Sequence, residues 1–185
     1  NTIFRDLVDQ INKGGGAICV DTNRVNLTVD HCNFEHCRSS NGGAIHVLYA
    51  KVNETLAGLV KNSRFENCEA NSNGGAADIN INQARRFSFT FEKCSFVRNK
   101  AKVGGAIRAI VRDMFTLSSC TFSNNEATSY GSSLYLEPGW NAKTDSDNVI
   151  VVKGNVFTFV PTLKNKINVQ IQTKGDNYKN AVLQL

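Results

Sequence analysis

The chain has 185 residues, a formal net charge of +5 and a pI near 8.9, a length that suits one domain or one long repeat array with a substantial core. Its Lys and Arg residues are scattered, which argues against a nucleic-acid partner, and no apolar run is long enough to span a bilayer. Asn is abundant, with 23 copies, and it favours turns and stacked side-chain ladders over ordinary strands.

The two ends of the chain differ from its middle. Near the N-terminus, Thr2 and Phe4 suit the tail of an earlier repeat, although the same stretch also suits a short capping helix. The chain begins without Met and has no signal peptide, so we expect an excerpt or a processed product. We predict one domain, 1–185, made of a possible N-terminal cap (1–13), regular coils (14–136), a loop (137–148) and C-terminal strands or a cap (149–185).

A glycine pair recurs through the middle of the chain, in steps of 27, 32, 30 and 27 residues. Its copies are Gly15-Gly16-Ala17-Ile18, Gly42-Gly43-Ala44-Ile45, Gly74-Gly75-Ala76-Ala77, Gly104-Gly105-Ala106-Ile107 and a degraded Gly131-Ser132-Ser133-Leu134. Repeats of this length indicate a solenoid or a similar array.

Further marks keep step with the glycine pairs. Each later pair is preceded by a phenylalanine, in turn Phe34, Phe65, Phe96 and Phe122. Two residues before each phenylalanine stand Cys32, Ser63, Cys94 and Cys120, and three residues after it stand Cys37, Cys68, Asn99 and Asn125. The apolar pair upstream differs in parity from the phenylalanine, so a bend must separate the two strands.

These marks predict an all-β fold, a right-handed parallel β-helix of about five coils with three short strands in each coil. Stacked coils place equivalent residues in columns about 4.8 Å apart. Phenylalanine then fills the core, Asn or Cys closes a corner against its counterpart in the next coil, and Gly-Gly supplies positive φ at a sharp turn. Leucine-rich and helical repeats do not fit, because neither a Leu-x-x-Leu-x-Leu signature nor a 3.6-residue period recurs.

Strand parity after the glycines separates inward from outward residues. The outward column contains Cys19, His46, Asp78, Arg108 and Tyr135, with Asp21, Asn80 and Glu137 two residues further along. We predict that His46, Asp78, Arg108 and Tyr135 form an exposed binding face. Trp140, in the following loop, is either an aromatic contact for a partner or a plug over the end of the solenoid.

The same column raises an enzymatic alternative, a polysaccharide lyase or hydrolase. Asp78 beside Arg108 suits a base next to a stabilising cation, or merely a surface ion pair worth under about 1 kcal/mol. Carboxylates for calcium are few, and two acids roughly 5–9 Å apart are not offered by adjacent coils. The three His residues have no Ser or Cys partner for a triad. We therefore expect no catalytic residues, metal or cofactor.

Six Cys residues suggest an oxidising compartment, although free Cys is also a good core residue. No tight zinc cluster is present, because Cys32 and Cys37 lack a partnering pair. Cys37 and Cys68 hold equivalent positions in adjacent coils, as do Cys94 and Cys120, and the coil spacing falls within the Cα range of a disulfide. Each pair is therefore either a disulfide or two stacked thiols.

Two N-glycosylation sequons occur, at Asn26 and at Asn53. Asn53 is the better candidate because it lies in an insertion that lengthens its coil. Asn26 lies at the entrance of a strand, where a glycan needs an outward corner.

The repeat resembles the chlamydial polymorphic outer-membrane protein family and related surface repeat proteins, whose marks are Gly-Gly-Ala-Ile and Phe-x-x-Asn. Gly42–Ile45 and Gly104–Ile107 match the first mark, and Phe96–Asn99 and Phe122–Asn125 match the second. The resemblance covers residues 14–136 and departs from the family where Cys37 and Cys68 replace Asn. It implies a secreted, surface-exposed and adhesive protein. The Cys residues and sequons suit an extracellular protein of another lineage equally well.

We therefore expect a non-catalytic, extracellular or cell-surface protein that acts as an adhesin or a structural component. Its partner would be a protein or a glycan surface. Another alternative is a filament subunit, since the ends of a β-helix are open sheet edges that invite end-to-end stacking.

Overall fold

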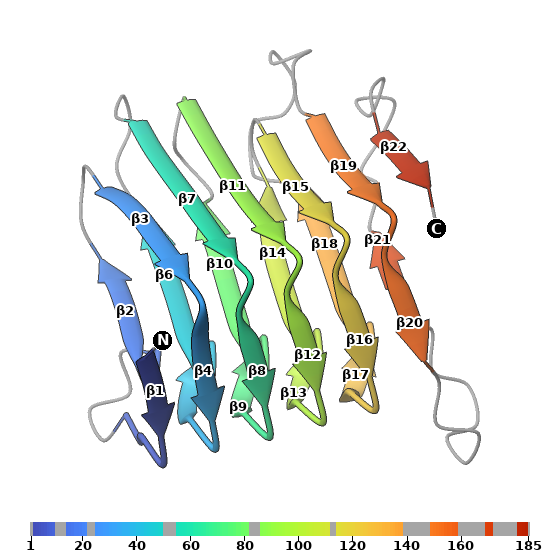
Figure 1. Cartoon of the computed structure of the whole chain (residues 1–185). Coiled ribbons are helices and arrows are strands. Elements are labelled where there is room, and N and C mark those ends of the chain that lie inside the picture. Colours follow the sequence, from blue (N-terminus) through green and yellow to red (C-terminus); the bar gives the residue numbers. More distant parts are fainter. Residues whose placement is uncertain are drawn as a thin grey trace.

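The computed structural model describes residues 2–9, 14–21, 25–49, 55–81, 86–111, 114–138, 149–158, 169–171 and 181–184. Within these residues the chain forms strands and turns and no helix. Every strand pair is parallel, and the strands stack into four sheets that run along one axis (Figure 1). The prediction of an all-β parallel β-helix is confirmed.

The four sheets are numbered here in the order in which the chain visits them. Sheet 1 contains β1 (Thr2–Arg5), β4 (Cys32–Glu35), β8 (Arg64–Glu66), β12 (Ser95–Val97), β16 (Thr121–Ser123) and β20 (Val156–Thr158). Sheet 2 contains β5 (Arg38–Asn41), β9 (Glu69–Asn73), β13 (Lys100–Val103) and β17 (Glu126–Tyr130). Sheet 3 contains β2 (Ile18–Asp21), β6 (Ile45–Tyr49), β10 (Ala77–Ile81), β14 (Ile107–Val111), β18 (Leu134–Pro138) and β21 (Val169–Ile171). Sheet 4 contains β3 (Val25–Asp30), β7 (Thr55–Lys61), β11 (Arg86–Glu92), β15 (Met114–Ser118), β19 (Val149–Lys153) and β22 (Ala181–Gln184).

The winding is right-handed. In Figure 1, the strands of sheets 4 and 1 face the viewer and run downward, while those of sheet 3 lie behind and run upward as the chain advances from left to right. Four coils, from β4 to β19, carry a strand in all four sheets, and a partial coil flanks them at each end. The predicted number of about five coils is therefore close.

The coils differ from the prediction in having four strands rather than three. The extra strand is that of sheet 2, which lies between the Cys or Asn corner and the glycine pair. These strands are short and polar, and the one small residue that each buries, such as Ala70 or Ala101, carries little apolar signal. Period-two alternation is hard to recognise with a single inward position.

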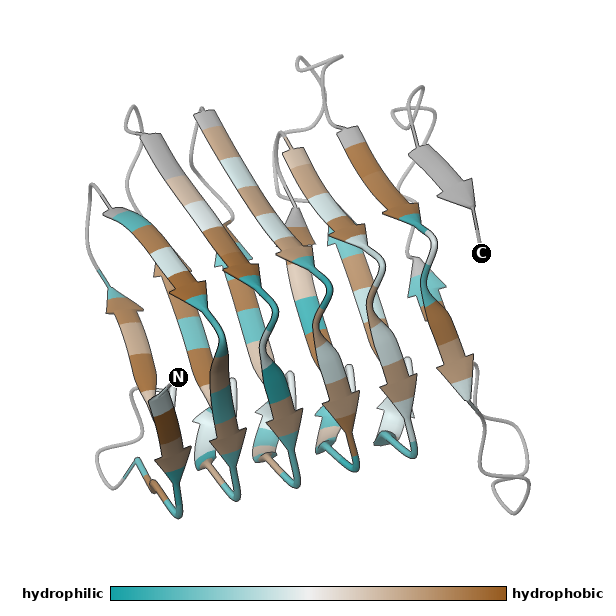
Figure 2. Cartoon of the chain, viewed as in Figure 1, coloured by the Kyte–Doolittle hydropathy of each residue, from teal (hydrophilic) through white to brown (hydrophobic). Residues whose placement is uncertain are grey.

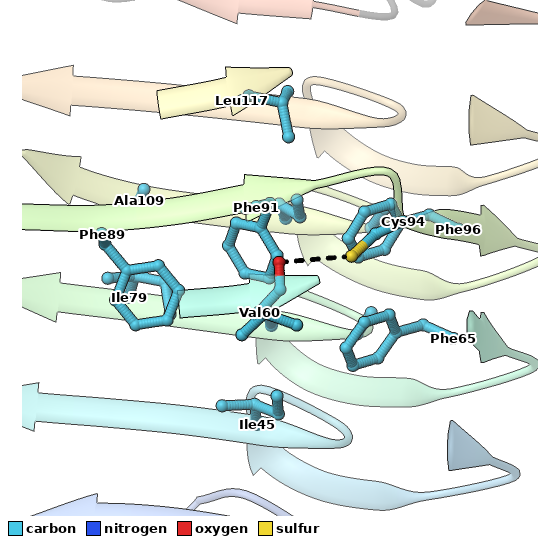
Figure 3. Close-up of a cluster of buried hydrophobic side chains, with 14 of the residues drawn as sticks. Ile45, Val60, Phe65, Ile79, Phe89, Phe91, Cys94, Phe96, Ala109 and Leu117 are labelled. Atoms are coloured by element: carbon cyan, nitrogen blue, oxygen red, sulfur yellow. Dashed lines mark hydrogen bonds between the residues drawn. The ribbon is translucent and has the colours of Figure 1, made fainter. Parts of the chain in front are cut away.

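Alternating side chains build the core, as predicted. Figure 2 shows hydrophobic and hydrophilic bands alternating along strands such as β10 and β11. Phe34, Phe65, Phe96 and Phe122 are buried and stack in one column with Phe4 and Phe157 at its ends, with ring centroids 4.7–4.9 Å apart. Figure 3 shows Phe65 and Phe96 beside Phe91 and Val60 in this core.

The structure differs from two predicted boundaries, those of the N-terminal cap (1–13) and of the loop (137–148). Residues 2–5 form β1, in register with Cys32–Glu35, and Phe4 stacks on Phe34. The alternative of an earlier repeat tail is therefore confirmed for these residues, and the capping helix is wrong there, because an extended strand lets Phe4 continue the phenylalanine column of the core. Strand β18 also runs to Pro138, so the predicted loop 137–148 begins later than expected.

The predicted bends are made by single residues with positive φ. A residue in the left-handed region stands before each corner residue; it is Gly154 before Asn155 and a non-glycine residue elsewhere, for example Lys93 at φ 51° before Cys94 and Arg98 at φ 52° before Asn99. That conformation costs a non-glycine residue energy, and the corner residue that follows stabilises the turn. Asn99 Nδ2 donates to Phe65 O at 3.1 Å, and Asn99 Oδ1 accepts from Cys68 N at 3.0 Å. Each corner therefore ties neighbouring coils together.

The glycine pairs are required by two different constraints. Gly74 has φ +59°, a conformation that L side chains rarely adopt. Gly75 has no room for a side chain, since an added Cβ would lie 2.1 Å from Gly105 O of the next coil. The first glycine therefore permits the sharp bend between sheets 2 and 3, and the second permits the close approach of neighbouring coils there.

Candidate functional site

The outward column of sheet 3 has the predicted register. Strand pairing places Cys19, His46, Asp78, Arg108 and Tyr135 side by side in successive coils. The second outward column brings Glu137 opposite Ile110, one coil beyond Arg108. The column therefore gathers titratable groups from β6, β10, β14 and β18.

Four of these groups form a continuous polar line, called the charge line below: His46, Asp78, Arg108 and Glu137. His46 Nε2 lies 3.5 Å from Asp78 Oδ2, and Arg108 Nη1 lies 3.1 Å from Asp78 Oδ1. Arg108 Nη2 lies 2.7 Å from Glu137 Oε1. The predicted contact between Asp78 and Arg108 is confirmed, and Arg108 also bridges two carboxylates.

The prediction that this column is exposed is wrong. His46 is 4% exposed and Asp78 1%, Tyr135 is also buried, and Arg108 is only partly accessible. Strand parity tells which way a side chain leaves its sheet, but it does not tell what packs over it.

Two contacts show how outward residues become buried. Backbone at Gly14 packs on His46, since a Cβ added at Gly14 would lie 2.0 Å from His46 Nδ1. At the other end, the Tyr130 ring of sheet 2 lies 6.1 Å from the Tyr135 ring. Backbone at Gly14 therefore covers the His46 end of the column, and a side chain of sheet 2, whose strands the sequence prediction had overlooked, lies against its Tyr135 end.

Burial governs the electrostatics of the charge line. Desolvation raises the pKa of Asp78 above its ordinary value, while the nearby Arg108 and His46 charges oppose that rise. Desolvation also raises the pKa of Tyr135, with a further contribution from Glu137. Arg108 forms ion pairs with the carboxylates of Asp78 and Glu137, which lie in the coils on either side of it. The opposite charges therefore link three successive coils.

Glu137 is the member of the line that sequence reasoning did not pair with Arg108. The prediction placed it in the neighbouring outward column, coils away from the other acids. A diagonal contact was the missing signal: Arg108 is long enough to reach a residue two positions further along the strand of the next coil. In the described part of the chain, no group of three or more His, Cys, Asp or Glu residues could hold a metal ion.

The six Cys residues are thiols in this structure, so of the two alternatives it contains stacked thiols. Cys37 and Cys68 occupy equivalent corners, and their S–H groups donate to Phe4 O and Phe34 O at 3.6 Å. Cys94 donates to Val60 O at 3.5 Å (Figure 3), and its own N–H donates to Cys120 Sγ at 3.4 Å.

The thiol stacks have a chemical consequence. A hydrogen bond with Cys37, together with burial, raises the pKa of Cys68, and the same causes act on the pKa of Cys120 through Cys94. A thiol with a raised pKa stays protonated and is a poor nucleophile. The same hydrogen bonds lower the pKa of the partner thiols, that of Cys37 through Cys68 and that of Cys94 through Cys120, so only one thiol of each pair is made a poorer nucleophile.

Of the remaining predicted sites, only Asn26 can be placed. Its side chain is exposed on the outer face of β3, an accessible position for a glycan. Asn53 and Trp140 lie outside the described residues.

No family model matches the chain, and no curated protein or solved structure matches it either. The resemblance to polymorphic outer-membrane proteins therefore rests on the repeat residues alone. Within the described residues, no helix is long and apolar enough to cross a membrane.

Proposed function

We propose that the chain is a non-catalytic β-helical component of an extracellular or cell-surface structure, acting as an adhesin or a structural element. The observation that carries this proposal is the internal pairing of the charge line. Asp78 and Glu137 both bind Arg108, and Asp78 is 1% exposed. General acid–base catalysis requires a group within hydrogen-bond reach of substrate, whereas a buried, compensated line suits a structural role.

Burial of the charge line moves the expected binding surface elsewhere, and the outer face of sheet 4 is the best alternative. Two of its outward columns carry no charge in the four coils from β3 to β15. This surface, called the uncharged face below, consists of Asn26, Thr28, Ala57, Leu59, Ser88, Thr90, Met114 and Thr116.

The uncharged face has the properties of a flat contact surface. Its side chains are small or β-branched except for Leu59 and Met114, and Met114 is 44% exposed. Registered strands keep the face regular, so a partner that repeats along its length would gain many modest contacts rather than one dominant contact. A polysaccharide or an extended protein surface has that geometry.

The binding part of the proposal is tested with the chain bearing Thr90→Lys and Thr116→Lys, on a glycan array and on fixed cells. Both positions are partly exposed and outward, so the fold should survive while two charges interrupt the face. We expect binding to fall severalfold. The matched control is Thr121→Lys, an exposed residue of sheet 1, which should bind as the unaltered chain does.

The catalytic alternative has its own readout on the same polysaccharides. We expect no soluble product from the unaltered chain or from Asp78→Asn. Product release that disappears in Asp78→Asn would replace the present proposal with a lyase or hydrolase built on the charge line.

A further inference from the structure

One outward column of sheet 1 changes character at both ends of the solenoid. Its members, in register from β1 to β20, are Ile3, Asn33, Arg64, Ser95, Thr121 and Val156. The four interior members are polar, whereas Ile3 and Val156 are aliphatic and each is 58% exposed. Exposed aliphatic side chains in this column therefore stand only in the two terminal coils.

The core shows the same break at its ends. Phe34, Phe65, Phe96 and Phe122 have a stacked ring on each side, but in the described residues Phe4 stacks only on Phe34 and Phe157 only on Phe122. Phe4, Ile18 and Leu27 at one end, and Phe157 and Val169 at the other, are only partly buried against the core. Each terminal coil therefore presents partly exposed core residues along the axis.

The sheet edges at the two ends are complementary. Sheets 1, 3 and 4 end in β1, β2 and β3 at one end and in β20, β21 and β22 at the other. All pairings are parallel, so the strands at both ends of the solenoid run in the same direction. The last strands of one copy could therefore pair in parallel with the first strands of another copy. An edge strand presents unpaired N–H and C=O groups that favour such pairing.

From these observations we propose that copies of this chain join head to tail, with β20 of one copy pairing in register with β1 of the next. The register follows from the existing pairs: Val156 would lie beside Ile3, Phe157 on Phe4 and Thr158 beside Arg5. In sheet 3 the same step places Val169 beside Ile18. The joint continues the phenylalanine column and covers the two exposed aliphatic residues with each other.

The partner that fits the exposed end of the solenoid is a second copy of the chain, because each copy carries both complementary ends. The contact is heterologous and related by translation along the axis, so it does not close and produces a filament. Six stacked strands about 4.8 Å apart predict a rise of about 29 Å per copy. This inference concerns the ends of the solenoid and is independent of the uncharged face.

The test uses Ile3→Glu and Val156→Lys, two exposed positions where substitution should leave the fold intact, as circular dichroism would verify. Sedimentation velocity over a concentration series and electron microscopy of the unaltered chain should show linear assemblies. Each variant alone should associate at least about tenfold more weakly, because a charge would be buried against an aliphatic neighbour. Thr121→Lys, in the middle of the same column, should assemble like the unaltered chain.

Mixing the two variants gives the decisive measurement. In a mixture, every second joint brings the lysine introduced by Val156→Lys against the glutamate introduced by Ile3→Glu, and the joints between have both native residues, so assembly should return. A chain that stays monomeric up to about 1 mM, a concentration that even a weak self-association would populate, overturns the proposal. So does assembly that persists in both single variants or fails to return on mixing. Glycan binding by a monomeric chain would leave the proposed function standing.

Discussion

Two polar columns run along this solenoid, one fully buried and one largely buried, and they satisfy their polar groups in different ways. The corner column, Cys37–Cys68–Asn99–Asn125, bonds mainly to backbone groups of the neighbouring coils. The charge line, His46–Asp78–Arg108–Glu137, bonds side chain to side chain. Every coil offers the same backbone groups, so the same type of corner residue can be used in coil after coil. In the charge line each side chain needs a particular side chain as its partner, so it depends on each individual residue.

The largest expected effect comes from breaking the charge line at its arginine. Arg108→Ala removes the guanidinium that pairs with both Asp78 and Glu137. The buried carboxylate of Asp78 then lies near that of Glu137 without the cation between them. We expect a loss of about 4 kcal/mol in the free energy of unfolding, measured by denaturant titration. The matched control is Arg98→Ala, which removes a half-exposed arginine paired with Glu66 and should cost under about 1 kcal/mol. Equal losses at the two sites would contradict the burial of the charge line.

Breaking the corner column should have the next largest effect. Asn99→Ala removes a side chain that accepts from Cys68 N and donates to Phe65 O, leaving a buried donor and a buried acceptor without partners. We expect a loss of about 3 kcal/mol, by the same titration. Asn33→Ala, at an outward position of sheet 1, is the control and should change stability by less than about 0.5 kcal/mol. If Asn99→Ala behaved like this control, the ladder would not stabilise the coils.

A smaller effect tests whether Cys and Asn are equivalent within the corner column. Cys68 donates to Phe34 O as Asn99 donates to Phe65 O, and an amide makes a stronger bond than a thiol. Cys68→Asn should therefore alter the free energy of unfolding by less than about 1 kcal/mol, whereas Cys68→Ala should cost about 2 kcal/mol. A larger loss in Cys68→Asn than in Cys68→Ala would mean that the N-terminal corners are apolar pockets.

The same contrast explains how much could be predicted from the sequence. Phenylalanine register, inward parity and the corner column follow from residues that recur at fixed spacing, and each of these is confirmed. The strands of sheet 2 do not follow, because one small inward residue such as Ala101 gives no readable alternation. Burial of the charge line does not follow either, since at its His46 end it depends on Gly14, which packs over the column from a neighbouring coil.

The smallest effect that we predict separates the charge line from ordinary surface acids by the sign of a pH dependence. Because burial raises the pKa of Asp78, with Arg108 and His46 opposing, the folded chain holds the Asp78 proton more tightly than the unfolded chain. The stability that this proton contributes is present below the unfolded pKa and is lost as the pH rises through the folded pKa. Asp78→Asn keeps a neutral side chain of similar shape that does not titrate.

The free energy of unfolding of the unaltered chain, minus that of Asp78→Asn, should therefore fall as the pH rises from 3 to 7. Asp30→Asn is a control of opposite sign. A hydrogen bond from Asn62 lowers the pKa of the Asp30 carboxyl, so the corresponding difference should rise with pH up to the unfolded pKa of about 3.9 and stay level above it. If the difference in the free energy of unfolding rose with pH for both Asp78→Asn and Asp30→Asn, the effect of Arg108 on the Asp78 pKa would outweigh that of burial. The carboxylate would then be held as a stable anion, and the line would behave as an ordinary ion pair despite its burial.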